Sequence, residues 1–314
     1  MALNLHLLRL FSTVAESGSF SRAADLLQIS QPAISQGVRD FELQLGCRLL
    51  DRSHKGVTPT REGRALMRHA NAMFSTERAA EEELKSLRSL DGGSLRVGAS
   101  TTIATYLLPA YLGEFHRNYP GIDLHLVSAN TREIASLLLD HKIEIALVEG
   151  PVAEPGLVSE LWQTDAMTLI TAPTHALALE SVLVKPERLC QEIMILREPG
   201  SGSREFVSHL LSALSITPAR RLEIGSTEAI KQLVAAGMGV SIVSTRSVAE
   251  QVALGRLVML EIAGHRLQRK LWMLKVPGRL SVPAAEAFEK LINQKRRPSA
   301  KAPSAAIHVK RARR

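Results

Sequence analysis

The sequence predicts an α/β protein whose N-terminal part is all-α. Two patterns predict this division. Up to about residue 90, apolar residues recur mainly at helical spacing. From Ser94 onward, short apolar strands alternate with amphipathic helices, which is typical of a parallel sheet covered by helices. The 314 residues include 45% hydrophobic and 22% charged side chains, a composition that allows a sizeable core.

The first 60 residues predict three short helices and then two short strands. The break at Ser17-Gly18-Ser19 ends the first helix, and Ser19 or Ser21 can cap the second. Pro32 suits the first turn of the third helix, where its missing N–H costs nothing, and Gly46 ends that helix. The expected helices are 4–16, a second one that ends at Leu27, and 31–45; the expected strands are 49–50 and 57–58, separated by a polar loop from Asp51 to Gly56.

The second and third helices suggest contact with DNA. Two short helices joined by a tight turn, the second rich in small polar groups, are typical of a helix-turn-helix, whose second helix enters the major groove. Gln31 can pair with adenine through its amide, and Ser35 is short enough for a close approach. We expect Arg39 and Arg52 to meet phosphates. The alternative is a helical oligomerisation module, because many small bundles share this pattern.

A long helix is expected over residues 60–89. A helix of about 30 residues is roughly 45 Å long, more than one small domain covers, so we expect a partner helix. The alternative is an amphipathic helix that packs on its own domain. Asp91-Gly92-Gly93 ends the helix and marks a hinge. Steps of four and three residues form a heptad seam of Leu66, Ala70, Met73, Glu77, Ala80, Leu84 and Leu87.

Residues 94–293 predict two α/β units joined end to end. Such pairs usually bind a small ligand between them, at the carboxyl ends of the strands. Strands are expected at 95–98, 122–127, 143–148, 167–172, 193–196, 222–224, 240–243 and 271–275, and helices at 103–119, 131–141, from Ser203, from Thr227 and at 283–293.

Three polar loops follow or approach strand ends, and each opens a helix. Hydroxyls and backbone N–H groups at a helix N-terminus form an anion site, so the loops predict a small anionic ligand. Glu149 ends a strand, and it would oppose an anion if it faced the same cleft. For the first loop, simple capping of the following helix explains the residues equally well. The loops are Ser100-Thr101-Thr102, Ser201-Gly202-Ser203 and Ser226-Thr227.

The net charge of +8 arises in the last 20 residues. Residues 295–314 hold eight basic side chains and no acidic one, so the rest of the chain holds 31 of each sign and is neutral. The pI of about 9.8 therefore gives no evidence about the folded part. We expect this tail, rich in Ser, Pro, Ala, Lys and Arg, to be disordered.

Several function classes lack their motifs. No apolar run is long enough to span a bilayer, and the N-terminus has no secretory pattern, which argues against a membrane protein and an exported solute-binding protein. The ten histidines show no metal spacing, and no nucleophile–base set or Gly-rich cofactor fingerprint appears. We expect no cofactor, no metal and no enzyme activity. Cys47 and Cys190 fit a reduced compartment, and Cys190 is expected to be buried.

Six short runs of residues within the first 64 positions have the types and spacing of a known DNA-binding domain. They are Leu10 to Phe20, Arg22 to Leu27, Ser30 to Gln36, Leu45-Gly46, Leu49 to Arg52 and Thr58 to Gly63. In these runs the chain resembles the N-terminal winged helix-turn-helix domain of LysR-type transcriptional regulators. The order of the later segments also matches, so the resemblance covers about residues 1–293. The loop Arg197–Arg204 resembles the cleft loop of the LysR subgroup that includes regulators of sulfur assimilation and carbon fixation.

The resemblance implies a cytoplasmic, homo-oligomeric regulator, a dimer or a dimer of dimers, that binds an interrupted palindrome in double-stranded DNA. It implies a winged helix-turn-helix at 1–60, a linker (dimerisation) helix and hinge at 61–91, and an effector-binding domain at 92–293, followed by the basic tail 294–314. The effector domain would have two Rossmann-like subdomains of periplasmic-binding-protein type, with subdomain I at 92–165 and 266–293 and subdomain II at 166–265.

The resemblance also implies where the chain passes between the subdomains and how an effector acts. The chain is expected to cross between subdomains near Thr164–Asp165 and to return near Gly264–Arg266, and a small molecule in the cleft would change DNA bending.

The resemblance and the loops together give two sets of candidate residues. Candidate DNA contacts are Ser21, Arg22, Gln31, Pro32, Ser35, Gln36, Arg39, Arg52 and Lys55; candidate effector contacts are Ser100, Thr101, Thr102, Glu149, Ser201, Gly202, Ser203, Ser226 and Thr227.

Overall fold

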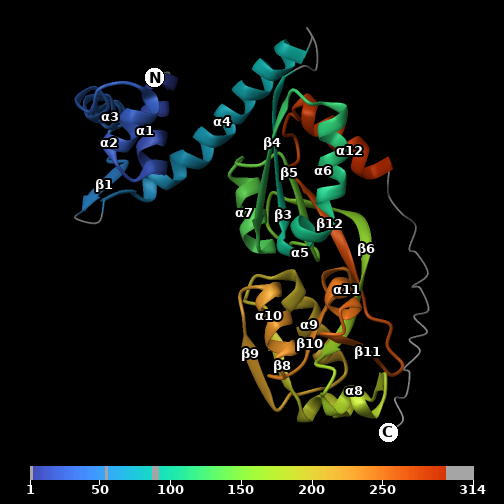
Figure 1. Cartoon of the computed structure of the whole chain (residues 1–314). Helices are drawn as coiled ribbons and strands as arrows, with labels where there is room; N and C mark the ends of the chain where they lie inside the picture. Colours follow the sequence, from blue (N-terminus) through green and yellow to red (C-terminus); the bar gives the residue numbers. More distant parts are fainter. Residues whose placement is uncertain (1–2, 54–55, 87–91, 295–314) are drawn as a thin grey trace. The chain divides into compact units, whose positions relative to one another are not determined.

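The computed structural model describes residues 3–53, 56–86 and 92–294 (Figure 1). The chain divides into two compact units. The first contains Met1–Ser89, Leu139–Lys142 and Gly278–Val282, and the second contains Leu90–Leu138, Ile143–Pro277 and Pro283–Arg314. The predicted basic tail, after its first residue Gln294, lies outside the described residues.

The three N-terminal helices form where local signals predict them. They are α1 (Leu5–Ser17), α2 (Phe20–Leu27) and α3 (Gln31–Leu45). The Ser19 hydroxyl accepts a hydrogen bond from the Arg22 N–H, and the Ser30 hydroxyl accepts one from the Ala33 N–H, so both serines cap helix starts. Gly18 and Gly46 end α1 and α3 at φ values of 67° and 69°, a conformation that favours glycine.

The two-stranded ribbon that follows α3, which forms the wing of the predicted winged helix-turn-helix, is longer than predicted. Strand β1 (Leu50–Ser53) pairs antiparallel with β2 (Gly56–Pro59), with Leu50 opposite Pro59. The predicted polar loop 51–56 is therefore wrong at both ends. Polar side chains do not prevent strand pairing here, because a two-stranded ribbon exposes them to solvent while its backbone groups pair.

Helix α4 (Arg61–Ser86) divides the predicted seam into two parts. Leu66 and Ala70 pack into the core of the first unit, which also contains Phe11 and Phe41, so the own-domain alternative holds for this part. The later positions Met73, Glu77, Ala80 and Leu84 are exposed in the single chain, and Glu77 pairs with Arg9. The last seam residue, Leu87, lies outside the described residues.

The main sheet of the second unit is mixed rather than entirely parallel. Strands β3 (Gly93–Ser100), β4 (Ile122–Ala129) and β5 (Ile145–Glu149) are parallel, with β3 between the other two. Strand β12 (Gln268–Lys275) pairs antiparallel with β5 and with β6 (Val158–Thr171). The strand order is β4-β3-β5-β12-β6, followed by β11 (Val258–Ile262) and β7 (Leu183–Val184).

Strand β6 belongs to both lobes of this unit. Its first part pairs with β12, and residues Met167–Thr171 pair with β10 (Ser241–Ser244) and β11 (Val258–Ile262). Figure 1 shows β6 and β12 passing between the two lobes. The sequence predicted strand only for residues 167–172, because the first part of β6 carries several exposed polar residues and lacks a continuous apolar run.

The first lobe carries α5 (Thr101–Tyr106), α6 (Leu108–Asn118), α7 (Thr131–Leu139) and α12 (Pro283–Gln294). The single predicted helix 103–119 is wrong, because the chain breaks between α5 and α6 at Leu107. Pro109 has no N–H to donate back to the Thr105 carbonyl, so an uninterrupted helix would lose a hydrogen bond at that position. The Phe115 and Phe288 rings pack edge-on with centroids 5.3 Å apart and join α6 to α12.

The second lobe contains several elements that the sequence patterns did not predict. Cys190 is exposed, so the prediction that it is buried is wrong: it lies in the short 3₁₀ turn η1, where the neighbouring Leu189 occupies the core instead. The predicted elements are β8 (Ile193–Leu196), α9 (Gly202–Ala213), β9 (Arg220–Glu223), α10 (Thr227–Ala235) and β10; those missed are α8 (Ala176–Glu180), β7 (Leu183–Val184), η1 (Pro186–Gln191), α11 (Thr245–Ala253) and β11.

Candidate functional site

The outer face of α2, α3 and β1 presents most of the predicted DNA contacts. Packing fixes which side of α3 faces outward, because Ile34, Val38 and Phe41 are buried in the core of this unit. At Gly37 a Cβ would lie 2.4 Å from the Leu10 side chain, so glycine permits the close approach of α3 to α1. The exposed candidates are Ser21, Arg22, Gln31, Pro32, Gln36, Arg39 and Arg52, whereas Ser35 is buried and Lys55 lies outside the described residues.

Ser35 anchors two arginines on this face. Arg52 lies over the Phe20 ring at 4.4 Å and donates from Nη2 to the Ser35 hydroxyl over 3.4 Å. The Arg39 Nε donates to the Ser35 carbonyl over 3.2 Å. Both guanidinium groups are thus held close to the surface of α3.

The two predicted base-reading amides on α3 differ in their surroundings. The Gln36 amide donates to Asp40 over 2.7 Å, which ties it to its own helix. Gln31 has no side-chain hydrogen bond to any other described residue. Gln31 is therefore the side chain that can bind a base edge without first breaking a bond.

Each of the three predicted polar loops contributes a hydroxyl to one cavity in the second unit. Thr102, Ser203 and Thr227 line it together with Arg197 and Ser244. The cavity has about 10 Å³ of space that a water-sized sphere can reach, which is room for about one water molecule. In this conformation it is nearly closed.

The remaining loop residues surround the cavity without lining it. Ser226 caps α10 by accepting a hydrogen bond from the Ala229 N–H, and the Thr101 hydroxyl reaches the Ala129 carbonyl over 3.5 Å. Ser100 precedes α5 but makes no side-chain cap bond, and its buried hydroxyl has no partner among the described residues. Simple capping therefore does not explain the first loop.

The two lobes meet closely where β5 of the first lobe ends and α9 of the second lobe begins. A Cβ on Gly202, which begins α9, would lie 1.8 Å from the Glu149 carbonyl oxygen at the end of β5. Glycine at this position is what allows the two backbones to approach. Ser201, next to it, is buried and donates its N–H to the Glu198 carbonyl over 3.2 Å.

A buried ionic network crosses between the lobes beside the cavity. Arg269 on β12 lies 2.9 Å from Glu149 and 2.9 Å from Asp165 on β6, and all three side chains are at most 3% exposed. Ser203 donates to Glu149 over 2.7 Å, and Ser244 donates to Asp165 over 2.9 Å. Asp165, Ser244 and Arg269 were not among the predicted site residues, because nothing in their local sequence distinguishes them from ordinary strand or cap residues.

Glu149 is charged in this environment. Burial raises its pKa, but the Arg269 charge, the hydroxyls of Thr102 and Ser203 and the Arg197 charge together bring the pKa of Glu149 below the usual value of 4.5. The sequence predicted that Glu149 would oppose an anion in the cleft. In the structure Arg269 already neutralises this carboxylate.

Arg197 places a second buried cation at the cavity. Its side chain is 7% exposed, and its Nη1 donates to the Thr227 hydroxyl over 2.8 Å. Its Nε and Nη2 donate to the two carboxylate oxygens of Glu198 over 2.7 and 2.8 Å. The sequence placed Arg197 in a polar loop without marking it as a ligand contact; its position directly after β8 was the available signal.

A further contact joins the lobes at the middle of α10. The buried Lys231 donates to the Tyr106 hydroxyl over 3.1 Å and to the Ser247 carbonyl over 2.9 Å, and it pairs with Glu228. Burial lowers the pKa of Lys231, but Glu228 and Tyr106 outweigh that effect and raise it above 10.5. Tyr106 belongs to the first lobe and Lys231 to the second, so this contact bridges the lobes independently of Arg269.

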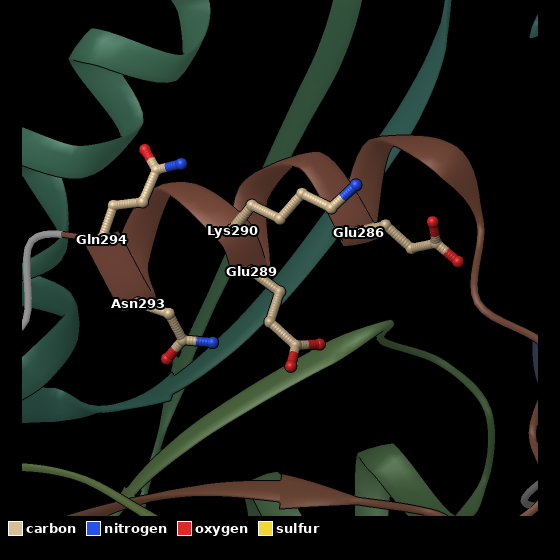
Figure 2. A pocket seen from close by; sticks show the side chains of 5 residues that line it. All are labelled: Glu286, Glu289, Lys290, Asn293 and Gln294. Carbon is tan, nitrogen blue, oxygen red and sulfur yellow. The ribbon is translucent and has the colours of Figure 1, made fainter.

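A second hollow lies on α12 and has a volume of about 570 Å³. Figure 2 shows its five lining side chains, Glu286, Glu289, Lys290, Asn293 and Gln294, all from this one helix. None of the predicted site residues lies there. Although it is larger, groups from different elements do not converge on it. The small cavity, lined by Thr102 of the first lobe and otherwise by residues of the second lobe, is therefore the better candidate site.

None of the helices that the structure describes is long and apolar enough to cross a membrane. Within the same residues, no group of three or more His, Cys, Asp or Glu side chains has the geometry to hold a metal ion.

Comparison with protein families gives two matches that together cover most of the chain. Residues 5–64 match the model described as "Bacterial regulatory helix-turn-helix protein, lysR family". Residues 88–297 match the model described as "LysR substrate binding domain".

Curated relatives match over nearly their whole length. The regulator YeiE of Escherichia coli K12, described as an uncharacterized HTH-type transcriptional regulator, is 35% identical over 87% of this chain and 92% of its own. The RuBisCO operon transcriptional regulator of Allochromatium vinosum is 31% identical over 93% of this chain and 96% of its own.

Solved structures agree. A full-length OxyR variant from Pseudomonas aeruginosa has a TM-score of 0.75 at 24% identity, over 93% of this chain and 94% of that one, and so supports the fold. The regulatory domain of Synechocystis PCC6803 CcmR, solved in complex with 2-PG, has a TM-score of 0.60 at 30% identity, over 64% of this chain and 96% of that one.

Proposed function

The chain belongs to the LysR family of transcriptional regulators, with a helix-turn-helix domain and an effector-binding domain, and from this we propose that a small anionic effector binds in the cavity between its two lobes. The effector would close or reshape the lobes and so change how the paired helix-turn-helix domains hold DNA. The relatives' names support regulation of transcription rather than catalysis.

One observation supports the anionic effector best. Hydroxyls from three separate loops, those of Thr102, Ser203 and Thr227, converge on a cavity that also contains the buried guanidinium of Arg197. Ser203 and Thr227 lie in the first turns of α9 and α10, which have 12 and nine residues, so their backbone N–H groups favour negative charge. Helix α5 has six residues, so we assign Thr102 only a hydroxyl role.

A small molecule in this domain also has a precedent. The related CcmR domain was solved with 2-PG bound, at 30% identity to this chain. The cavity here has room for about one water molecule, so the proposal requires that the lobes or side chains move to admit a ligand.

We infer that the DNA partner is a double-stranded interrupted palindrome, read by a homodimer or homotetramer in the cytoplasm. Met73, Glu77, Ala80 and Leu84 form an exposed stripe at heptad spacing on α4, which a second α4 helix would cover. Gln31 on α3 would read a base, and Arg52 would bind a phosphate.

The test is a melting screen of inorganic anions and small carboxylates on three full-length proteins: wild type, Thr102→Val and Thr101→Val. A true effector should stabilise the wild type by about 2.7 kcal/mol at a hundredfold excess over its Kd. Thr102→Val removes a cavity hydroxyl and should lose most of this shift. Thr101→Val is the matched control, because the Thr101 hydroxyl bonds to Ala129 and does not line the cavity.

DNA binding should remain intact in both variants. Equal ligand shifts in all three proteins would place the ligand elsewhere. Stabilisation by apolar or cationic compounds alone would refute the anionic effector.

A further inference from the structure

We propose that Glu198 is an internal competitor of the effector: its carboxylate occupies the position on Arg197 that an anionic group of the effector must take. The inference rests on the proposed function and adds to it the residue that sets anion affinity. It also defines the ligand chemistry, an anionic group with two oxygen atoms in one plane, such as a carboxylate or a phosphate.

The geometry around Arg197 is that of a filled anion site. A guanidinium binds a carboxylate or phosphate best through two parallel N–H···O bonds, and Glu198 supplies such an arrangement at 2.7 and 2.8 Å. The third arm of the guanidinium is held by Thr227, which lines the cavity. An anion from solution can therefore take the Nε–Nη2 edge of Arg197 only if Glu198 leaves that edge.

Of the two carboxylates near the cavity, Glu198 is the one that can leave. The side chain of Glu149 is 2% exposed and is held by Arg269 and Ser203, so its removal would leave a buried cation unpaired. The side chain of Glu198 is 24% exposed, and within the described part of the chain its carboxylate is bonded to Arg197 alone. Rotation of Glu198 into solvent returns its charge to water, while the incoming anion neutralises Arg197.

The backbone next to Glu198 is fixed, so the exchange requires a side-chain rotation and no loop movement. The Ser201 N–H donates to the Glu198 carbonyl over 3.2 Å, which closes a turn with Pro199 and Gly200 at its centre. Gly200 has a φ of 90°, as the third residue of a type II turn requires. Its carbonyl accepts the Arg132 N–H of α7 over 3.2 Å, so this turn is bound to the first lobe as well.

This arrangement gives Glu198 two effects on ligand choice. Neutral and cationic molecules cannot replace a carboxylate on Arg197 without leaving a buried charge unpaired, so they are rejected. Weakly bound anions are rejected as well, because they must compete with a carboxylate that is always present at high local concentration.

The experiment is a phosphate titration of full-length protein, followed by melting temperature at constant ionic strength. Glu198→Gln keeps the size of the side chain and removes the competing charge, so its apparent Kd for inorganic phosphate should fall about tenfold below that of the wild type. Glu205→Gln is the matched control: it makes the same charge change nearby on the exposed face of α9, and its Kd should equal that of the wild type. Arg197→Met combined with Glu198→Gln should lose the gain.

The outcomes test two hypotheses separately, the effector site at Thr102 and the competitor role of Glu198. Equal phosphate responses of wild type and Glu198→Gln, including no response in either, would overturn the competitor role. Glu198→Asp, with a shorter carboxylate, provides a second comparison and should fall between the two if Glu198→Gln does not fold. A ligand from the melting screen that requires Thr102 but binds Glu198→Gln and wild type equally would support the proposed function and refute this inference. A tighter phosphate site in Glu198→Gln without any Thr102-dependent ligand would show competition for anions at Arg197 but reject Thr102 as part of the effector site, and with it the role of Glu198 toward the effector.

Discussion

Two proposed sites differ in how many of their polar groups already have a partner within the protein. One is the exposed face of α2, α3 and β1, which we call the DNA-reading surface, and the other is the cavity lined by Thr102, Ser203 and Thr227, which we call the effector cavity. On α3, Gln31 is exposed and makes no side-chain bond to the other described residues, and most neighbouring candidates are exposed too. In the cavity, Arg197 and Ser203 are buried, and each is bonded to a side chain of the protein. A surface of the first kind binds its partner without rearrangement, whereas the second kind must exchange internal bonds for ligand bonds.

This difference predicts where substitutions cost stability and where they cost recognition. Variants of the ionic network should destabilise the fold, because a buried charge without its partner is expensive. Variants of the DNA-reading surface should leave the fold intact and weaken binding.

The largest effect is expected for Arg269→Met, which leaves Glu149 and Asp165 without their shared cation. Loss of one partner of a buried ion pair typically costs about 3–5 kcal/mol in the free energy of unfolding. Urea denaturation of the effector domain within the full chain measures it.

Arg246→Met is the matched control for this prediction. Arg246 also lies near Asp165, at 3.7 Å, but its side chain is 47% exposed, so its loss should cost about 0–1 kcal/mol. Equal destabilisation by the two variants would show that the buried network does not bind the lobes together.

Gln31→Ala should have the next largest effect, on recognition alone. Removing one base contact should cost about 1–3 kcal/mol of specific binding and relax the preference at one base pair. The measurement is the ratio of affinities for operator and random duplex, and an unchanged ratio would reject Gln31 as a base-reading residue.

Two comparisons sharpen this result. Gln36→Ala should have a smaller effect, because the Gln36 amide is already bonded to Asp40. Arg52→Ala should weaken specific and non-specific binding alike and reduce the slope of log K against log salt by about 1.

The smallest expected effect concerns acid. The folded state holds the pKa of Glu149 below its usual value of 4.5, so the charged form stabilises the fold above about pH 4.5, and this contribution is lost as the pH falls below that value. The stability difference between wild type and Glu149→Gln should therefore be greatest near pH 7 and should shrink toward pH 4. Urea unfolding at several pH values tests this, and a difference that grows with acid would contradict the assigned direction.

The sequence predicted the three N-terminal helices well because their signals are local. Ser19, Ser30, Gly18 and Gly46 each act within a few residues to begin or end a helix, so their roles can be read from spacing. The three polar loops of the effector domain were also found, since the carboxyl ends of parallel strands mark a site on general grounds. That they share one cavity follows from the structure.

The ionic network was not predictable because its partners are distant in sequence. Arg269 meets Asp165 across 104 positions and Ser203 across 66, and no spacing rule connects them. Helix α4 shows the same limit in another form: its heptad pattern could not reveal that Leu66 and Ala70 pack on their own unit, while Met73 and Leu84 remain exposed.

The position of β12 has a consequence for synthesis of the chain. This strand lies between β5 and β6, so the main sheet cannot be completed until residues near the C-terminal end have left the ribosome. At about 5–20 residues per second, the roughly 200 residues after the helix-turn-helix unit take roughly 10–40 s to make. During that time a nascent chain contains all of α1, α2 and α3 but only part of the main sheet. A chain that ends before β12 would therefore contain the helix-turn-helix but lack the completed main sheet of the effector-binding domain.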